Sequence, residues 1–189
     1  LILASVLNPF IIWWIGDKYV LPSFTVFLII INLVVQMFRN TSFVFIDSYG
    51  LYWIQRWKSI IEATINLTCS LILLIFFNMG INGVLLGTLI SSLGYVLWVE
   101  VFYIFKYGLK VSMSVYIKLF SKYCFLLGLA TLITVYAQSL IAYSGLVSII
   151  YKAIMSIFIG GVLYLVFYSR SSEFKYLLNI AKKVLGRKS

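Results

Sequence analysis

Between residues 63 and 99 the sequence contains no charged side chain. An α-helix rises about 1.5 Å per residue, so about 20 apolar residues cross the hydrocarbon core of a bilayer. This run is long enough for two crossings, and it is interrupted only by the short segment Asn78–Gly83, which contains two glycines and two asparagines. The sequence therefore predicts two membrane-spanning helices, at 59–77 and 83–105, joined by a tight turn.

Three further apolar runs predict spans at 22–40, 119–140 and 146–168, preceded by a partial helix at 1–13 that ends near Asn8-Pro9 and Trp13-Trp14. Strands of a membrane β-barrel alternate in polarity over about ten residues, and no segment here does so. We therefore expect an all-α, polytopic bundle over residues 1–168. The chain begins at Leu1 with an apolar stretch already under way, so we expect it to be part of a longer protein.

The basic residues divide unequally between the two sides that this topology defines. Thirteen fall on one side and only Lys18 on the other, while Lys152 lies inside the last span. Cytoplasmic loops carry the excess of Lys and Arg in membrane proteins, so the C-terminus is predicted to be cytoplasmic. The thirteen are Arg39, Arg56, Lys58, Lys106, Lys110, Lys118, Lys122, Arg170, Lys175, Lys182, Lys183, Arg187 and Lys188.

Residues 169–189 form a separate basic tail. Apolar residues recur there at helical spacing, from Phe174 to Leu185, with lysines off that face. Such a helix is expected to lie on an anionic cytoplasmic leaflet, or else the tail is solvated and only sets the topology.

Composition excludes several classes of function. Only 11% of residues are charged and the mean hydropathy is +1.07, so the net charge of +10 is better explained by membrane topology than by binding to nucleic acid. The sequence has no histidine, and Cys69 and Cys124 lie inside predicted spans, which leaves no metal site or cysteine–histidine pair. No phosphate-binding loop or other enzyme motif appears, so we expect neither catalysis nor a cofactor.

Polar residues inside spans are candidates for lining a substrate cavity, because such side chains tend to face the bundle interior or water. Asn66 is equally suited to a structural hydrogen bond between helices. Lys152 can extend outward to water or face a cavity, and Arg39, at the predicted inner end of its span, can attract a phosphate or set the topology. Glu62 and Glu100 are placed at span ends, so no buried carboxylate for ion coupling is expected. The candidates are Asn32, Gln36, Arg39, Asn66 and Lys152.

Gly83, Gly87 and Ser91 are spaced four residues apart, which places three small side chains on one helix face. Such a ridge lets another helix approach closely. It is typical of static packing and also of a surface between helices that slide during transport.

Three blocks of sequence carry a resemblance to a known family. They are residues 8–21 (NPFIIWWIGDKYVL), residues 50–67, which begin GLYW and contain RWKSIIEA, and residues 80–88 (GINGVLLGT) followed by Ser91. In order and spacing they resemble the C-terminal half of bacterial polysaccharide-unit flippases, of the multidrug/oligosaccharidyl-lipid/polysaccharide exporter superfamily. The resemblance covers about residues 5–106, and beyond it only the span pattern and the basic tail agree.

The resemblance implies a function and a location. Members of this family move undecaprenyl-diphosphate-linked sugar repeat units from the inner to the outer leaflet of the bacterial cytoplasmic membrane, by alternating access between two helix lobes, and can work beside other polysaccharide-assembly proteins. This chain would supply part of the second lobe and two terminal spans. The alternatives are a drug/cation antiporter of the same superfamily, a membrane-embedded glycan polymerase or ligase, and a non-catalytic scaffold.

Overall fold

In the computed structural model, the described residues are 1–139, 145–169, 174, 176, 178–180 and 183. All regular structure in this part of the chain is helical. Five helices are long and apolar enough to cross a membrane: Ser23–Tyr49, Lys58–Ile75, Ile81–Leu109, Ser114–Ser139 and Gly145–Tyr168. These helices confirm the prediction of an all-α chain with five helices that are long and apolar enough to span a membrane.

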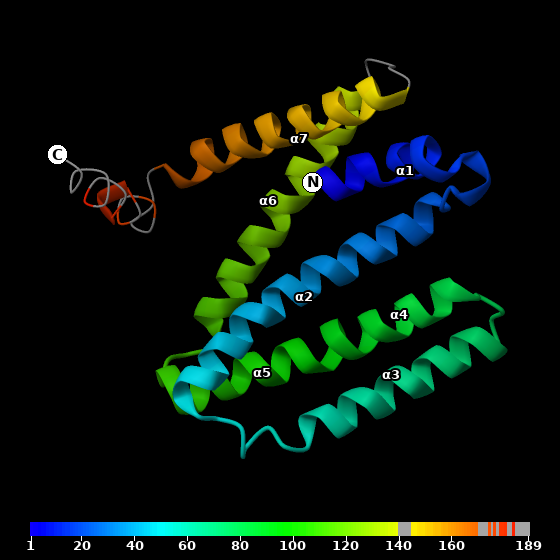
Figure 1. Cartoon of the computed structure of the whole chain (residues 1–189). Coiled ribbons are helices and arrows are strands. Elements are labelled where there is room, and N and C mark those ends of the chain that lie inside the picture. The colour runs from blue at the N-terminus through cyan, green and yellow to red at the C-terminus, as the bar shows by residue number, and fades with distance from the viewer. Residues whose placement is uncertain (140–144, 170–173, 175, 177, 181–182, 184–189) are drawn as a thin grey trace. The chain divides into compact units, whose positions relative to one another are not determined.

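The helices belong to two compact units, Val20–Phe125 and Leu1–Tyr19 with Leu126–Ser189. In the first unit, α2 (Ser23–Tyr49), α3 (Lys58–Ile75) and α4 (Ile81–Ser91) lie side by side (Figure 1). The helix that begins with α4 continues through α5 (Leu97–Tyr103), and its two other parts, Ser92–Val96 and Ile104–Leu109, are π-helical. The start of α6 (Ser114–Ser139) completes this unit.

Helix α2 is longer than the sequence predicted. The span expected at 22–40 continues to Tyr49, because Arg39 and Asp47 do not end the helix and Gly50 does. Gly50 adopts the left-handed conformation (φ 63°), and its N–H bonds to the carbonyls of Ile46 and Asp47. With 27 residues, α2 is about 40 Å long, and Arg39 lies within it rather than at its end.

The segment after α2 folds back onto the bundle. Leu51 packs with Ile46 and Ile104 in a buried apolar cluster. The Tyr52 hydroxyl donates a 2.5 Å hydrogen bond to the Asp47 carboxylate, and this bond raises the pKa of Tyr52 above its ordinary value.

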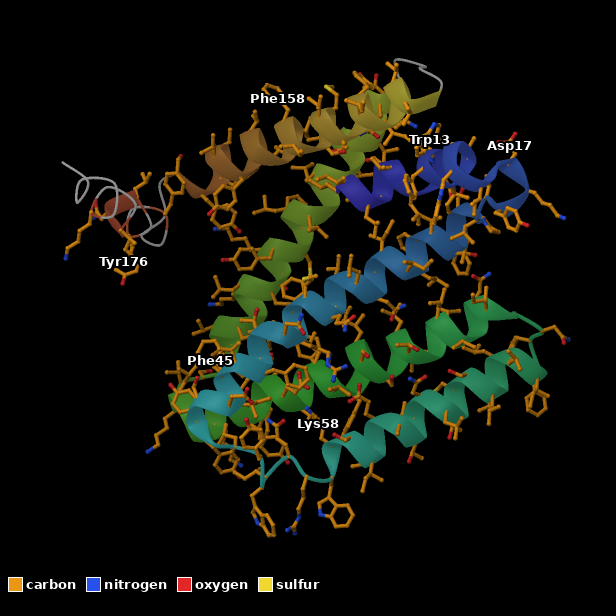
Figure 2. The ribbon with its side chains drawn as sticks, in the orientation of Figure 1. Trp13, Asp17, Phe45, Lys58, Phe158 and Tyr176 are labelled. Carbon is orange, nitrogen blue, oxygen red and sulfur yellow. The ribbon has the colours of Figure 1, made fainter. Side chains whose placement is uncertain are left out.

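Aromatic rings join α6 to its neighbours in the first unit. Phe120 lies 5.1 Å from Phe38 of α2 and 5.6 Å from Trp98 of α5, measured between ring centroids, and Tyr116 lies 5.9 Å from Phe105. An apolar pocket of about 320 Å³ lies among these helices, beside Phe45, which Figure 2 labels. These contacts anchor the first turns of α6 to α2 and to the helix Ile81–Leu109.

The second unit contains α1 (Ile2–Ile15), the remainder of α6 and α7 (Gly145–Tyr168). The predicted helix end near Trp13-Trp14 is confirmed to within two residues, because α1 ends at Ile15, before Gly16 (φ 95°). The end near Asn8-Pro9 is wrong, because α1 continues through Pro9. Gln138 of α6 donates to the Ser156 hydroxyl of α7 at 3.0 Å, and Ser156 lies 3.2 Å from Ser5 of α1. One buried polar group therefore connects the three helices of this unit.

The predicted basic tail, 169–189, lies mostly outside the described residues. Its described positions from Phe174 to Lys183 are helical. The amphipathic, membrane-surface role of the tail stays a prediction.

Candidate functional site: a polar pocket beside a buried charge cluster

One face of α2 is polar although the helix is apolar enough to span a membrane. Asn32, Gln36 and Asn40 follow one another at four-residue intervals, which places their amides in a row. Asn32 donates to the carbonyl of Leu28, at 2.9 Å, and across to that of Leu85 on α4, at 3.1 Å. This second bond fixes the polar face of α2 against α4.

Gln36 and Asn40 differ from Asn32 because their amides are not hydrogen-bonded within the described chain. Both side chains are exposed, and neither amide has a hydrogen-bond partner among the residues that the structure describes. A carboxamide can donate two hydrogen bonds and accept two. These two side chains therefore offer unused donors and acceptors on a helix that is otherwise largely apolar.

Arg39 extends from the same part of α2 and pairs with Glu62 of α3. Its two terminal nitrogens lie 2.8 Å and 3.2 Å from the two carboxylate oxygens, which is the bidentate arrangement that makes arginine–carboxylate pairs strong and directional. A third contact, at 3.4 Å, reaches the hydroxyl of Ser92. Arg39 thus connects α2, α3 and the π-helical segment after α4.

Glu100 of α5 is the most deeply buried acid of the described chain. Its side chain is 0% exposed, and its Oε1 accepts from Lys58 at 2.6 Å and from Arg39 at 3.4 Å. Figure 2 shows Lys58 at the start of α3, from which its side chain reaches the helix that carries Glu100. The expectation that no carboxylate is buried is therefore wrong. The helix continues nine residues past Glu100, so this acid does not lie at a span end.

The four charged groups balance one another. Two cations, Arg39 and Lys58, face two carboxylates, Glu62 and Glu100. Phe43 covers the cations on one side, with its ring centroid 5.6 Å from the Arg39 guanidinium carbon and 5.0 Å from Lys58 Nζ. Charges that leave water are tolerated when they are paired in this way, so the cluster can persist inside a bundle.

A pocket of about 330 Å³ opens beside this cluster, between α2, α3 and the helix that begins with α4. Its size is at the lower end of the range for small-ligand sites, about 300–1,000 Å³. Seven of the eight lining side chains are polar or charged. The lining residues are Asn32, Gln36, Arg39, Asn40, Phe43, Glu62, Thr88 and Ser92.

Three of the five predicted cavity residues, Asn32, Gln36 and Arg39, line this pocket. Asn66 does not, and it accepts a bond from Ser70 one turn along α3. Lys152 belongs to the other unit, where its backbone carbonyl accepts from Gln138. A role for any of the five in binding a substrate stays a prediction.

The small-residue ridge lies at the contact between α4 and α3. Gly83, Gly87 and Ser91 are all buried. A Cβ on Gly87 would come within 2.1 Å of Ser70 Oγ and 2.8 Å of the Ser70 backbone nitrogen, and one on Gly83 would lie 3.2 Å from Leu73. The two helices therefore approach so closely that only glycine fits at residue 87.

Sequence reasoning missed the parts of the site that depend on contacts between helices. Asn40 follows Gln36 at one-turn spacing, so extending the row on α2 would have found it. Glu62 is separated from Arg39 by 23 positions and by a loop, and no local pattern pairs them. Phe43 is one of many aromatic residues, and its place at the pocket follows only from the packing.

Within the described ranges, no group of three or more His, Cys, Asp or Glu residues could hold a metal ion. Comparisons of this chain with protein-family models, with curated proteins and with solved structures found no match. The class of the protein therefore follows from the length and apolar composition of its helices. It is a multi-pass helical membrane protein with a polar pocket between its spans.

Proposed function

We propose that this chain is the C-terminal portion of a flippase that moves undecaprenyl-diphosphate-linked polysaccharide repeat units from the inner to the outer leaflet of a bacterial cytoplasmic membrane. The observation that carries the proposal is the polar pocket in an otherwise apolar helix bundle. The blocks at 8–21, 50–67 and 80–91 support it through their resemblance to such transporters. In this proposal the C-terminus is cytoplasmic, and the partners are the lipid-linked oligosaccharide, the bilayer and other assembly proteins.

The physical problem that such a protein solves is desolvation. A sugar repeat unit carries many hydroxyl groups, and each one costs several kcal/mol to transfer unpaired into hydrocarbon, roughly 2–7 by the transfer scales. Amides and hydroxyls that line a pocket between spans replace the lost water. Gln36 and Asn40 suit this role because their hydrogen-bonding groups are not already used within the described chain.

A second candidate is a cation-coupled drug antiporter, and Glu100 is the observation that favours it. Glu100 is a carboxylate buried within a span beside Lys58 and Arg39, and ionisable residues inside membrane helices commonly mark ion or substrate pathways. In that case transport by the full-length protein would require Glu100 and an ion gradient, and an organic cation would be the substrate.

The deciding experiment is deletion of the full-length gene in its host. Loss of the flippase should stop surface polysaccharide and leave lipid-linked repeat units on the cytoplasmic leaflet, where they resist enzymes added from outside. Loss of a polymerase would instead leave them accessible on the outer leaflet. Unchanged polysaccharide together with greater sensitivity to cationic drugs would favour the antiporter.

A further inference from the structure

We infer that the pocket beside Arg39 binds an uncharged sugar ring of the transported glycan, and not its diphosphate. This inference rests on the proposed flippase function and assigns one part of the substrate to one site. Its basis is the combination of a polar lining, a balanced set of charges and two amides without partners.

The charge balance argues against phosphate. A diphosphate site needs cations that are not already neutralised, preferably guanidinium groups that can donate two bonds to the same anion. Here both terminal nitrogens of Arg39 are bound to Glu62, and Lys58 donates to the buried Glu100 at 2.6 Å. An anion entering the pocket would also meet the Glu62 carboxylate on its wall. Binding phosphate at Arg39 would therefore require breaking its ion pair with Glu62, which would leave the Glu62 carboxylate without its cation.

The same lining argues against an apolar drug. Phe43 is the single apolar side chain among the eight that surround the pocket. Sites for drug-sized ligands are mostly lined by apolar side chains with a few polar groups, whereas seven of the eight side chains that line this pocket are polar or charged. An organic cation would gain little, because the Glu62 carboxylate is already paired with Arg39.

A sugar hydroxyl both donates and accepts a hydrogen bond, and the pocket offers groups of both kinds. Gln36 and Asn40 provide amide donors and carbonyl acceptors from α2, and Thr88 and Ser92 provide hydroxyl groups from the facing helix. Asn32 holds α2 against α4 through its 3.1 Å bond to Leu85, which keeps the two polar walls in register. Phe43 supplies an apolar surface for the C–H face of a sugar ring.

The test uses the purified full-length protein in detergent and saturation-transfer NMR with methyl glycosides of glucose, galactose and N-acetylglucosamine. At least one glycoside should receive saturation from the protein. The double variant Gln36→Leu/Asn40→Leu should reduce that signal at least fivefold, while the control Asn179→Leu, which removes an exposed amide outside the pocket, should leave it unchanged. Inorganic pyrophosphate at equal concentration should not displace the glycoside.

Two results would overturn the inference. One is displacement of the glycoside by pyrophosphate, or pyrophosphate binding that the double variant abolishes. The other is the absence of glycoside binding, or binding that the double variant leaves intact, in protein whose thermal unfolding is normal. Gene deletion separates these results from failure of the proposed function. If deletion blocks polysaccharide export but the double variant restores it fully, the flippase assignment stands and the sugar site does not.

Discussion

The buried pair of Lys58 and Glu100 gives the most direct test of how this bundle is stabilised. Glu100 is fully buried, and its Oε1 accepts from Lys58 at 2.6 Å and from Arg39 at 3.4 Å. Replacing Glu100 by Gln leaves Lys58, only 8% exposed, without a counter-charge, whereas Arg39 keeps Glu62. Removing one partner of a buried ion pair typically destabilises a protein by about 3–5 kcal/mol, and we expect Glu100→Gln to fall in this range.

Lys58→Met should cost less, because Glu100 retains its contact with Arg39. We expect roughly half of the Glu100→Gln effect, since one of the two cations remains in place. The double variant should lose less stability than the sum of the single variants, with a coupling of about 2 kcal/mol, because neither charge is then left alone.

The assay is unfolding of the full-length protein by SDS in mixed micelles, followed by tryptophan fluorescence. The control is Asp17→Asn, an exposed acid in the 3₁₀ turn that follows α1, which should change the free energy of unfolding by less than about 0.5 kcal/mol. Strictly additive effects, or a loss below about 1 kcal/mol for Glu100→Gln, would refute the reasoning, because they would show that the carboxylate is hydrated and not dependent on the ion pair.

Three further outcomes follow from the packing and the topology. Gly87→Ala should lower the free energy of unfolding by about 1–3 kcal/mol, because the added methyl group would overlap α3. The control Gly94→Ala should have little effect, because its methyl group would meet open space, and equal losses for the two variants would contradict the close approach of α4 to α3. Gln138→Leu should cost about 1 kcal/mol in the same assay by removing the bond between α6 and α7, and no change would mean that this bond is replaceable. The topology can be tested with single cysteines in a cysteine-free version of the full-length protein in cells. A cysteine that replaces Ile81 should react with an impermeant maleimide added outside, and one that replaces Ser112 should not. The reverse pattern would mean that the topology is inverted.

The number and type of the membrane helices could be predicted from the sequence because each span must satisfy its backbone internally and is therefore a long apolar helix. The end of α2 could not. Arg39, a basic residue after an apolar run, predicts a helix that ends near residue 40, but α2 continues to Tyr49 and Arg39 pairs with Glu62 within the bundle. A charged residue marks the end of a span when it is hydrated, but not when another side chain of the bundle neutralises it.

The lining of the pocket could also be predicted only in part from the sequence. The row of amides on α2 is a local pattern with helical spacing, so Asn32 and Gln36 could be selected in advance. The burial of Glu100 depends on Lys58, 42 positions away, and on the helix persisting through its second π-helical segment to Leu109. Contacts of this kind depend on how three helices pack, which no single-helix pattern contains.

The internal neutralisation of Arg39 and Lys58 also determines how this protein responds to ionic strength. Arg56, Lys106 and Lys110 are exposed cations of the same unit. Dissolved salt weakens the attraction between exposed cations and headgroup phosphates over about 8–10 Å. The buried pairs are shielded from dissolved ions. Raising the salt concentration should therefore weaken the contacts of these exposed cations with anionic headgroups well before it affects the connections among the helices of this unit.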